Sequence, residues 1–450
     1  MALPLGRQLA RFCAAALITT AQHVAAEEAS STTTAPEPQT YDMKLQATWV
    51  RQIKPGFGAA YSGPNSLSAA RETSYSFTAT VAMGWRVWSG GEFYFNPEAA
   101  QGVPLSGLTG LGGFSNGEMA RTAGPDLRIY HARIFLRQSF DLGGTRESVP
   151  SAMNQLAGDV DRRRVVVSVG NLSVLDLFDG NAYSHDPRTQ FLNWSLMTHG
   201  AYDYAADARG YSWGAAVEWF HDDWAVRAGR FAQPKRPNEM ELDPHLVRHY
   251  GDQVELEHGH ELSGQPGRVR LLAFRNKTRM ARFREAIDLA AVTGGVPDID
   301  AVRNSEALRY GGGVNLEQQI RPDLGAFFRA SWSNGRTETY AFTEIDRSIS
   351  GGLSWSGRAW QRPDDTLGLG VVRNTLSSDR RRYLEAGGIS FFIGDGAIRY
   401  APETLVEAWY SLGLASHFRV SLDVQRIWNP AYNAARGPVS VGSLRLHMEF

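Results

Sequence analysis

The most regular pattern along the chain is an alternation of apolar and polar residues with a period of two. It is clearest at the C-terminus, where 442–450 places apolar residues at even positions and polar residues at odd ones. Successive side chains of a β-strand point to opposite faces, so this stretch predicts a strand with one apolar and one polar face. The apolar face carries Leu444, Leu446, Met448 and Phe450, and the polar face carries Ser443, Arg445, His447 and Glu449.

The same alternation predicts further strands over 75–87, 130–140, 211–219, 324–332 and 418–424. In the second and third of these strands it places Tyr130 and Tyr211 on the apolar face and His131 on the polar face. Weaker versions of the pattern surround Val165, Val254, Val314, Leu353, Leu369 and Tyr410.

Two features indicate where the apolar faces point. The polar faces mix Arg, Glu, Gly and Ser, which a water-filled lumen tolerates and a packed core does not. The apolar faces carry aromatic residues near strand ends, as the interfacial belt of a membrane protein requires. The pattern therefore predicts an all-β fold, a transmembrane antiparallel β-barrel, with a secreted soluble all-β protein as the alternative. The belt candidates are Tyr75, Trp85, Tyr211, Trp219, Phe328 and Trp332.

The N-terminus has the features of a secretory signal peptide. A basic start with Arg7 and Arg11 precedes a short apolar run and then small residues up to Ala26, after which we expect cleavage. The apolar run is shorter than the ~20 residues of a membrane-spanning helix. Cys13 is the single cysteine, so the exported chain would have no disulfide. The expected division of the chain is signal peptide 1–26, polar linker 27–42 and barrel 43–450.

Length sets the expected size of the barrel. A strand that crosses the bilayer takes about 10 residues. The alternating segments recur about every 25 residues once loops are included, which gives about 16 strands. A barrel of that size encloses an aqueous channel rather than a filled core. Charge adds little, because 46 basic and 47 acidic residues nearly cancel and leave no basic field for nucleic acid.

The polar faces supply the chemistry that a sugar channel would need. A polyol that enters a pore loses hydration, so the wall must return hydrogen bonds through Arg forks and carboxylates and offer aromatic faces to the ring. Any one of these charged residues could instead form an ordinary ion pair between neighbouring strands. The evidence for a sugar-binding lining is therefore that many such residues point inward together. The expected pore lining is Arg86, Glu92, Tyr94, Asn96, Arg133, Arg137, Arg227, Glu255, Glu257 and Arg329.

Residues 171–197 break the alternation and are too many for a turn. We expect an extracellular loop, partly helical around 186–196, that folds into the mouth or lumen and narrows the channel. A surface loop ordered by its own caps is the alternative. Residues 276–306 also lack alternation and have helical spacing, which predicts a second long loop. The residues expected to tie the first loop to the wall are Asp176, Asp179, Asp186 and Arg188.

An ordered set of sequence strings resembles the carbohydrate-selective porins of the OprB family. The likeness spans about residues 43–450, and its specificity comes from the whole set, since each string is weak alone. It implies a sixteen-stranded outer-membrane channel through which glucose and related sugars diffuse passively. The strings are GEFYFNPEAAQG (91–102), DLFDGNAYSHDPRTQFLNW (176–194), WAVRAGRF (224–231), GDQVELEH (251–258), YAFTEIDRS (340–348), FFIGDG (391–396) and SLDVQRIWNPAYNAARGPVSV (421–441).

Other functions stay open at this point. An outer-membrane enzyme would need a recognisable catalytic motif, such as a G-x-S-x-G elbow, an H-E-x-x-H sequence or a cluster of metal ligands. We expect none of these motifs in the chain. His258 and His260 fit a solvated loop better than a metal site. An arginine-lined channel for anions or acidic saccharides and a scaffold without transport are further alternatives.

The expected partners follow from the barrel. They are small sugars, outer-membrane lipid and the barrel-assembly machinery, because the terminal Phe450 resembles the signal that this machinery reads in outer-membrane barrels. We expect no catalytic residues, no metal, no cofactor and no nucleic acid. The pattern is compatible with a monomer or a homotrimer.

Overall fold

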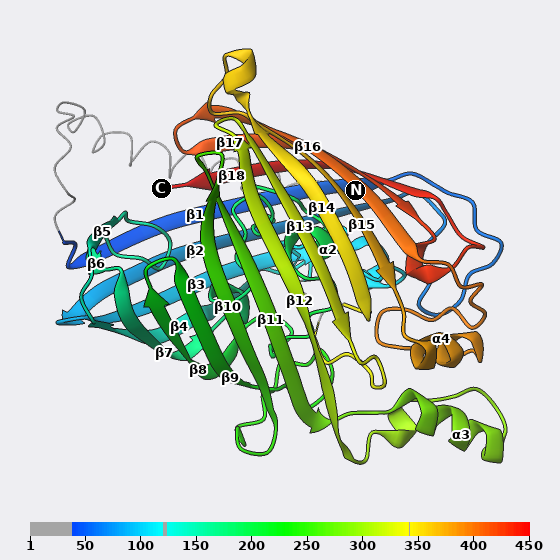
Figure 1. Ribbon diagram of the computed structural model, residues 1–450. Helices are drawn as coiled ribbons and strands as arrows, with labels where there is room; N and C mark the ends of the chain where they lie inside the picture. Colours follow the sequence, from blue (N-terminus) through cyan, green and yellow to red (C-terminus); the bar gives the residue numbers. More distant parts are fainter. Residues whose placement is uncertain (1–37, 120–123, 342) are drawn as a thin grey trace. The chain divides into compact units, whose positions relative to one another are not determined.

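The computed structural model describes residues 38–119, 124–341 and 343–450. Within these ranges sixteen antiparallel strands close into a barrel, as the alternation predicted (Figure 1). The expected signal peptide and most of the linker lie outside the described residues, so the boundaries proposed there stay predictions.

The wall strands are long enough to cross a bilayer, and their bounds extend most of the predicted segments by a few residues. They are β1 (Tyr41–Lys54), β2 (Glu72–Trp88), β3 (Gly91–Val103), β4 (Arg128–Asp141), β7 (Arg163–Leu172), β8 (Ser212–His221), β9 (Trp224–Ala232), β10 (Tyr250–Leu262), β11 (Gln265–Arg279), β12 (Glu306–Arg321), β13 (Leu324–Ser333), β14 (Arg347–Ser356), β15 (Thr366–Thr375), β16 (Glu403–Ala415), β17 (Phe418–Trp428) and β18 (Val439–Glu449).

Each wall strand pairs with its neighbours in chain order, and β1 pairs with β18 to close the ring. The C-terminal residue takes part in this closure, since Phe450 and Leu45 exchange backbone hydrogen bonds of 2.8 and 3.0 Å. A small separate hairpin, β5 (Arg146–Val149) and β6 (Gly158–Asp161), is inserted between β4 and β7, which pair directly.

The two ends of the barrel differ in the length of their connections. At the turn end most hairpins are tight; Ser263 and Gly264 join β10 to β11 with φ of 53° and 72°, the left-handed conformation that two-residue hairpin turns require. At the loop end every connection is longer. Bacterial outer-membrane barrels have short periplasmic turns and long extracellular loops, so the loop end is extracellular. The exceptions at the turn end are the connection 357–365 and the longer connection 142–162, which holds β5 and β6.

The described loops contain short helices. None of them is long and apolar enough to span a membrane. Their bounds are η1 (Leu105–Leu108), η2 (Val174–Asp176), α2 (Trp194–Met197), α3 (Phe283–Thr293), η3 (Asp300–Val302), η4 (Gly357–Trp360), α4 (Ser378–Glu385) and η5 (Pro430–Tyr432).

The alternation assigns sidedness correctly along most of the wall. In β18 the polar residues Arg445 and His447 are buried in the lumen, whereas Leu446 lies on the outer face. Large aromatic side chains are exposed on the outer surface near the strand ends, as a membrane belt requires. They include Trp85, Trp213, Trp219, Trp224, Trp332 and Trp428.

The sidedness predicted for the start of β4 is wrong. The pairing of β3 with β4 shifts between Asn96, which faces Arg133, and Pro97, which faces His131, so Ala132 is an extra residue. Such a bulge reverses the faces on one side of it. Tyr130 therefore points into the lumen, where its hydroxyl donates to Glu98 at 2.5 Å, and His131 is exposed.

Tyr211 is a second correction. It was expected on the apolar outer face, but it lies just before β8, where the chain still follows the loop rather than the strand. Its side chain is buried in the lumen, and its hydroxyl donates to Glu98 at 3.3 Å.

The loops also differ from expectation in detail. Helix in the 186–196 region is confined to α2, which begins at Trp194, and residues 186–189 form a turn instead. The first residues of the stretch 276–306 extend β11 to Arg279. Alternation is hidden there because inward Asn276 and Thr278 and outward Lys277 are all polar. The helical spacing after it corresponds to α3.

Part of the inner wall is apolar, although a water-filled lumen would be lined by polar residues throughout. Val439, Val441, Leu405 and Trp409 point inward and are fully or nearly fully buried. They pack with Phe191 and other apolar loop residues in one core cluster. A loop that folds into the barrel therefore packs against this apolar part of the inner wall.

Candidate functional site

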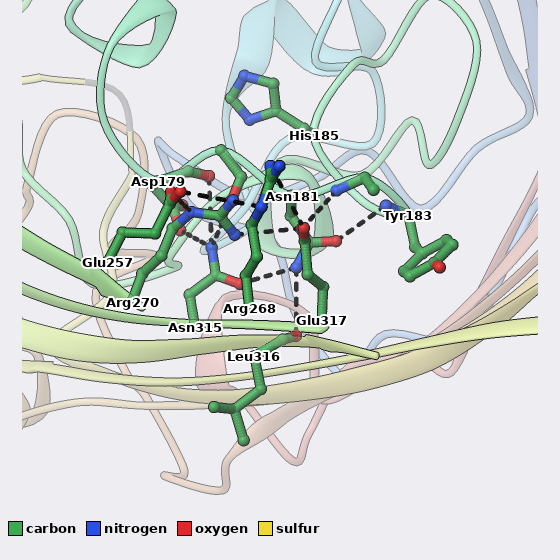
Figure 2. Close-up of polar contacts among 12 residues, drawn as sticks. Asp179, Asn181, Tyr183, His185, Glu257, Arg268, Arg270, Asn315, Leu316 and Glu317 are labelled. Atoms are coloured by element: carbon green, nitrogen blue, oxygen red, sulfur yellow. Dashed lines mark hydrogen bonds and ion pairs between the residues drawn. The ribbon is translucent and has the colours of Figure 1, made fainter. Parts of the chain in front are cut away.

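Residues 173–211, here called the inner loop, fold into the lumen and are bound to the wall by buried polar contacts. Asp179 is the centre of one anchor: Arg329 on β13 donates from Nε at 3.0 Å, and the two side chains are 0% and 1% exposed. Asn315 on β12 also contacts Asp179 (Figure 2). Burial would raise the pKa of Asp179, but Arg329, His199 and hydrogen bonds from 198 and 199 outweigh it and hold this pKa below its usual range.

His199 sits in the same anchor without a strong partner of its own. Its Nε2 is 3.5 Å from Asp179 Oδ1, and the ring is buried. Burial lowers the pKa of His199 to about 4, with a further contribution from the charge of Arg329 and an opposing one from Asp179. The ring is therefore neutral at neutral pH.

A second set of anchors holds the later part of the inner loop against the inner faces of β16 and β18. Glu407 on β16 accepts hydrogen bonds from the backbone amides of Leu192 and Asn193 at 2.6 and 3.0 Å. Arg445 on β18 donates to the carbonyls of Pro187 and Gln190, both at 2.7 Å. The contacts place α2 against β14 and β15, inside the barrel (Figure 1). One side of the lumen is thus filled.

The opposite side of the lumen keeps a cavity of about 680 Å³. Its wall is formed by inward residues of β1–β4, β7 and β8, and the inner loop forms its other face. Residues 149–160 of the connection that holds β5 and β6 also line it, at the turn end. The lining includes six arginines and six carboxylates, so its formal charge is balanced.

The cavity has an upper cluster towards the loop end, built from Glu98, Tyr130, Arg133, Asp176, Arg188 and Tyr211. Glu98 on β3 accepts from Tyr130, from Tyr211 and, at 2.6 Å, from Thr80. Arg133 on β4 grips Asp176 with both arms of its fork, at 2.7 and 2.6 Å. The guanidinium of Arg133 also lies 5.2 Å from the Tyr211 ring centroid.

Arg188 of the inner loop completes the upper cluster. It lies between two acids, with Nε 2.9 Å from Glu118 and a terminal nitrogen 3.5 Å from Glu98. Burial is the largest influence on Glu118 and raises its pKa, while Arg188 and the hydroxyl of Thr78 oppose this. The charge on Arg188 is correspondingly stabilised by the two carboxylates.

A lower cluster lies towards the turn end and consists of Arg86, Glu92, Tyr94 and Arg137. Glu92 is 3.3 Å from Arg86 and 3.9 Å from Arg137, and it accepts from the Tyr94 hydroxyl at 2.7 Å. Arg137 also donates to the carbonyl of Asn154 at 2.8 Å. A solute that crosses the cavity along the barrel meets the two clusters in turn.

Comparison with known proteins agrees with a barrel that encloses a charged cavity. The family described as "Carbohydrate-selective porin, OprB family" matches residues 64–450. The chain belongs to the OprB family of carbohydrate-selective porins. It is therefore a β-barrel porin of the bacterial outer membrane.

One solved structure supports this OprB fold, and a second is similar only at a lower level. The high-pH structure of Pseudomonas putida OprB has 16% sequence identity and a TM-score of 0.70, with 91% of this chain and 94% of that chain covered. A Pseudomonas aeruginosa protein, OccK2 (OpdF), has 8% identity and a TM-score of 0.43, with 91% and 97% covered. A search of curated protein sequences returned no match.

The residues expected to line the pore of this OprB-family chain divide into two groups. Those that border the cavity are Arg86, Glu92, Arg133 and Arg137, together with Asp176, Asp186 and Arg188 of the inner loop. The others lie away from it. Tyr94 is buried behind Glu92, and Asn96 is fully buried in the wall.

The five remaining expected residues take part in contacts away from the cavity. Arg227 on β9 bonds to Glu255 and Glu257 on β10, each at 3.0 Å, and to Glu218 at 2.9 Å. Arg329 and Asp179 form the anchor described above. Inward orientation was therefore predicted from alternation, whereas access to solute depends on where the inner loop packs.

The residues at the centre of the upper cluster, Glu98, Tyr130 and Tyr211, were not among the predicted pore-lining residues. Glu98 could have been found, since alternation from Asn96 along β3 points it inward. Tyr130 and Tyr211 could not, because a bulge and a loop segment reverse the expected faces.

Two strings, GFSNG (113–117) and GYSWG (210–214), match G-x-S-x-G, contrary to expectation. Neither forms a nucleophile elbow, which needs an exposed serine between a strand and a helix. Ser115 is buried in a loop and donates to Gln52 at 2.9 Å. Ser212 opens β8, is fully buried and donates to the carbonyl of Ala232 at 2.7 Å.

Proposed function

We propose that this OprB-family porin conducts neutral sugars of monosaccharide size, such as glucose, by passive diffusion into the periplasm. The observation that carries the proposal is the balanced lining of the cavity, in which arginine forks, carboxylates and tyrosine rings lie together. A cavity of about 680 Å³ also falls within the ~300–1,000 Å³ typical of small-molecule sites.

The chemistry of the lining suits a polyol. Carboxylates accept from sugar hydroxyls, and arginine N–H groups donate to them, so water lost at the entrance is replaced. Tyr130, which is half-buried and borders the cavity, offers apolar surface to the C–H side of a sugar ring, whereas Tyr211 is buried beside Arg133. Weak contacts repeated in two clusters favour transit over tight binding, because a solute must also leave.

Charge pairing argues against a preference for anions. Arg133 is held by Asp176, Arg188 by two glutamates, and Arg86 by Glu92. Each guanidinium already has a carboxylate beside it, so an anionic solute would have to compete with a fixed negative charge. A neutral solute can use the remaining hydrogen-bond capacity without that competition.

Liposome swelling with purified protein tests the proposal. We expect faster swelling with glucose-sized monosaccharides than with trisaccharides, and slower swelling with gluconate than with glucose. Arg86→Ala and Glu92→Ala should change the order among sugars while the barrel still folds. Equal rates for glucose and a trisaccharide, or faster entry of gluconate, would contradict the proposal.

A further inference from the structure

The outer face of the wall carries an unusual row of charges at the loop end. Arg230 on β9, Asp252 on β10 and Arg275 on β11 occupy directly opposite positions on neighbouring strands. Their chain neighbours Phe231 and Gln253 are buried in the lumen, so the three charged side chains point outward. A charge on the lipid-facing surface is costly near the middle of the bilayer and tolerated at its edge.

The row is rigid and carries excess positive charge. Asp252 accepts from Nε of Arg230 at 2.7 Å and from Nε of Arg275 at 3.0 Å, so one carboxylate serves two guanidinium groups. The two arginine side chains are 42% and 54% exposed. The ring of Tyr250 lies 4.0 Å from the Arg230 guanidinium and supports it. Both forks keep unused donors in a fixed orientation.

Two residues further along β11, positive side chains again outnumber carboxylates. Lys277 on β11 lies 3.2 Å from Glu306 on β12, and Arg248 contacts the same carboxylate, as does His249 at 3.4 Å. Asp243 close by is bonded by His245 and His249. The rim patch, defined as Arg230, Arg248, Arg275 and Lys277 with Asp252 and Glu306, thus has more cations than carboxylates, even when Asp243 is counted.

An apolar furrow on the outer wall begins at this patch. It has a volume of about 560 Å³, and Arg230 and Leu246 stand at one end. The cross-strand row from Arg230 continues through Ala215, Val169 and Leu136 to Phe93, all of which line the furrow. The small side chain of Ala215 and neighbouring glycines leave room for an extended hydrocarbon chain.

We propose that the furrow and the rim patch bind one anionic, phosphate-bearing lipid of the outer leaflet. Its phosphate accepts from the free N–H groups of Arg230 and Arg275, which match phosphate geometry, and an acyl chain lies in the furrow. A second copy of the chain related by a two-fold axis fits this face less well, because it would bring two positively charged patches together.

The turn end offers a matched comparison. Arg163 at the start of β7 pairs with Asp222 at 2.7 Å and is 45% exposed, and His221 lies 3.5 Å from the same carboxylate. Here one carboxylate serves one arginine, so the two charges balance. An exposed arginine on its own is therefore not the feature that we infer to bind lipid.

Native mass spectrometry of the purified full chain in a neutral detergent tests the proposal. The probes are dimyristoyl phosphatidic acid, dimyristoyl phosphatidylcholine and inorganic phosphate. We expect one bound phosphatidic acid per barrel at concentrations where phosphatidylcholine and inorganic phosphate do not bind. Replacing both arginines (Arg230→Gln with Arg275→Gln) should weaken phosphatidic acid binding about thirtyfold, and Arg163→Gln should leave it unchanged.

A furrow variant separates the two halves of the site. Ala215→Trp should fill the furrow and weaken phosphatidic acid binding while the rim charges stay in place, and heat-dependent gel mobility checks that each variant folds. Equal binding of phosphatidic acid and phosphatidylcholine would overturn the proposal. So would unchanged binding in the double arginine variant, or a lipid-free dimer that is lost in the Ala215→Trp variant.

Discussion

At the residue scale, Glu98 is the carboxylate at the centre of the upper cluster. It is the acceptor for Tyr130, Tyr211 and Thr80, and it is one of the two acids beside Arg188. Glu98→Gln keeps the shape of the side chain and removes one negative charge from the lining. We expect the reversal potential in a KCl gradient to shift towards chloride and the entry of gluconate to rise relative to glucose.

Glu257 provides the matched control for this substitution. It is also an inward glutamate bound to arginines, with Arg227 at 3.0 Å and Arg270 at 2.7 Å, but it does not border the cavity. Glu257→Gln should leave ion preference unchanged. If both variants shift the reversal potential equally, the cavity is not the path of the ions.

His199 gives the inner loop a dependence on pH. Its pKa falls from 6.5 to about 4 because the ring is buried. Between pH 4 and pH 6.5 this histidine therefore binds more protons in the unfolded chain than in the folded one. Its contribution to stability falls as the pH drops through that range. The loss reaches about 3 kcal/mol at pH 4, at about 1.4 kcal/mol per unit. Asp179 adds nothing in this window, since its own stabilisation is lost only below its ordinary pKa of 3.8.

The expected measurement is the temperature at which the barrel loses its compact gel mobility, compared at pH 7 and pH 4.5. Buried acids such as Glu118, whose pKa is raised, respond to acid in the opposite sense, so the informative quantity is the change in melting temperature between pH 7 and pH 4.5 in a variant compared with the unmodified chain. On going from pH 7 to pH 4.5, the melting temperature of His199→Gln should fall less, or rise more, than that of the unmodified chain. His131→Gln, which changes an exposed histidine on the outer face, should show the same change as the unmodified chain. An equal response in both variants would assign the pH dependence to other groups.

At the scale of elements, the connection between β4 and β7 stands out because it is the longest at the turn end. Residues 149–160 border the cavity, and the carbonyl of Asn154 holds Arg137. Replacing 142–162 with a short turn should widen the periplasmic exit. We expect higher single-channel conductance and faster swelling with trisaccharides.

A shortened extracellular loop is the control for this deletion. Shortening 284–304, which contains most of α3 and lies outside the cavity lining, should leave both readouts unchanged. Unchanged trisaccharide entry after removal of 142–162 would show that the inner loop alone sets the size limit.

Strand positions and sidedness were largely predictable from sequence because each wall strand meets lipid on one face and the lumen on the other. The prediction failed where a local irregularity broke the period of two. The bulge at Ala132 turned Tyr130 inward, and the loop before β8 did the same to Tyr211. Neither deviation has a signal in the alternation itself, and both changed the composition of the upper cluster.

The site was less predictable than the wall for a different reason. Alternation gives the direction of a side chain but not what packs above it. Arg329 and Arg133 both point inward, yet Arg329 is covered by the inner loop and Arg133 borders the cavity. That difference depends on contacts between residues far apart in the sequence, such as Glu407 with Leu192.

At the scale of the whole molecule, closure of the barrel depends on the last strand, β18, and Phe450 directly follows it. Its backbone pairs with Leu45 on β1, and its ring stacks on His417 at 5.0 Å. The backbone bonds do not need an aromatic side chain, so backbone pairing alone does not account for the ring. We predict that the assembly machinery recognises the ring during insertion into the outer membrane.

Phe450→Ser separates recognition from closure. We expect much less folded protein in the outer membrane of cells, because the side chain is lost as a signal, while the purified variant refolds into detergent as efficiently as the unmodified chain. Met448→Ser, which changes an outward residue two positions earlier, should assemble normally in cells. Poor refolding of Phe450→Ser in detergent would show instead that the aromatic ring stabilises the closed barrel.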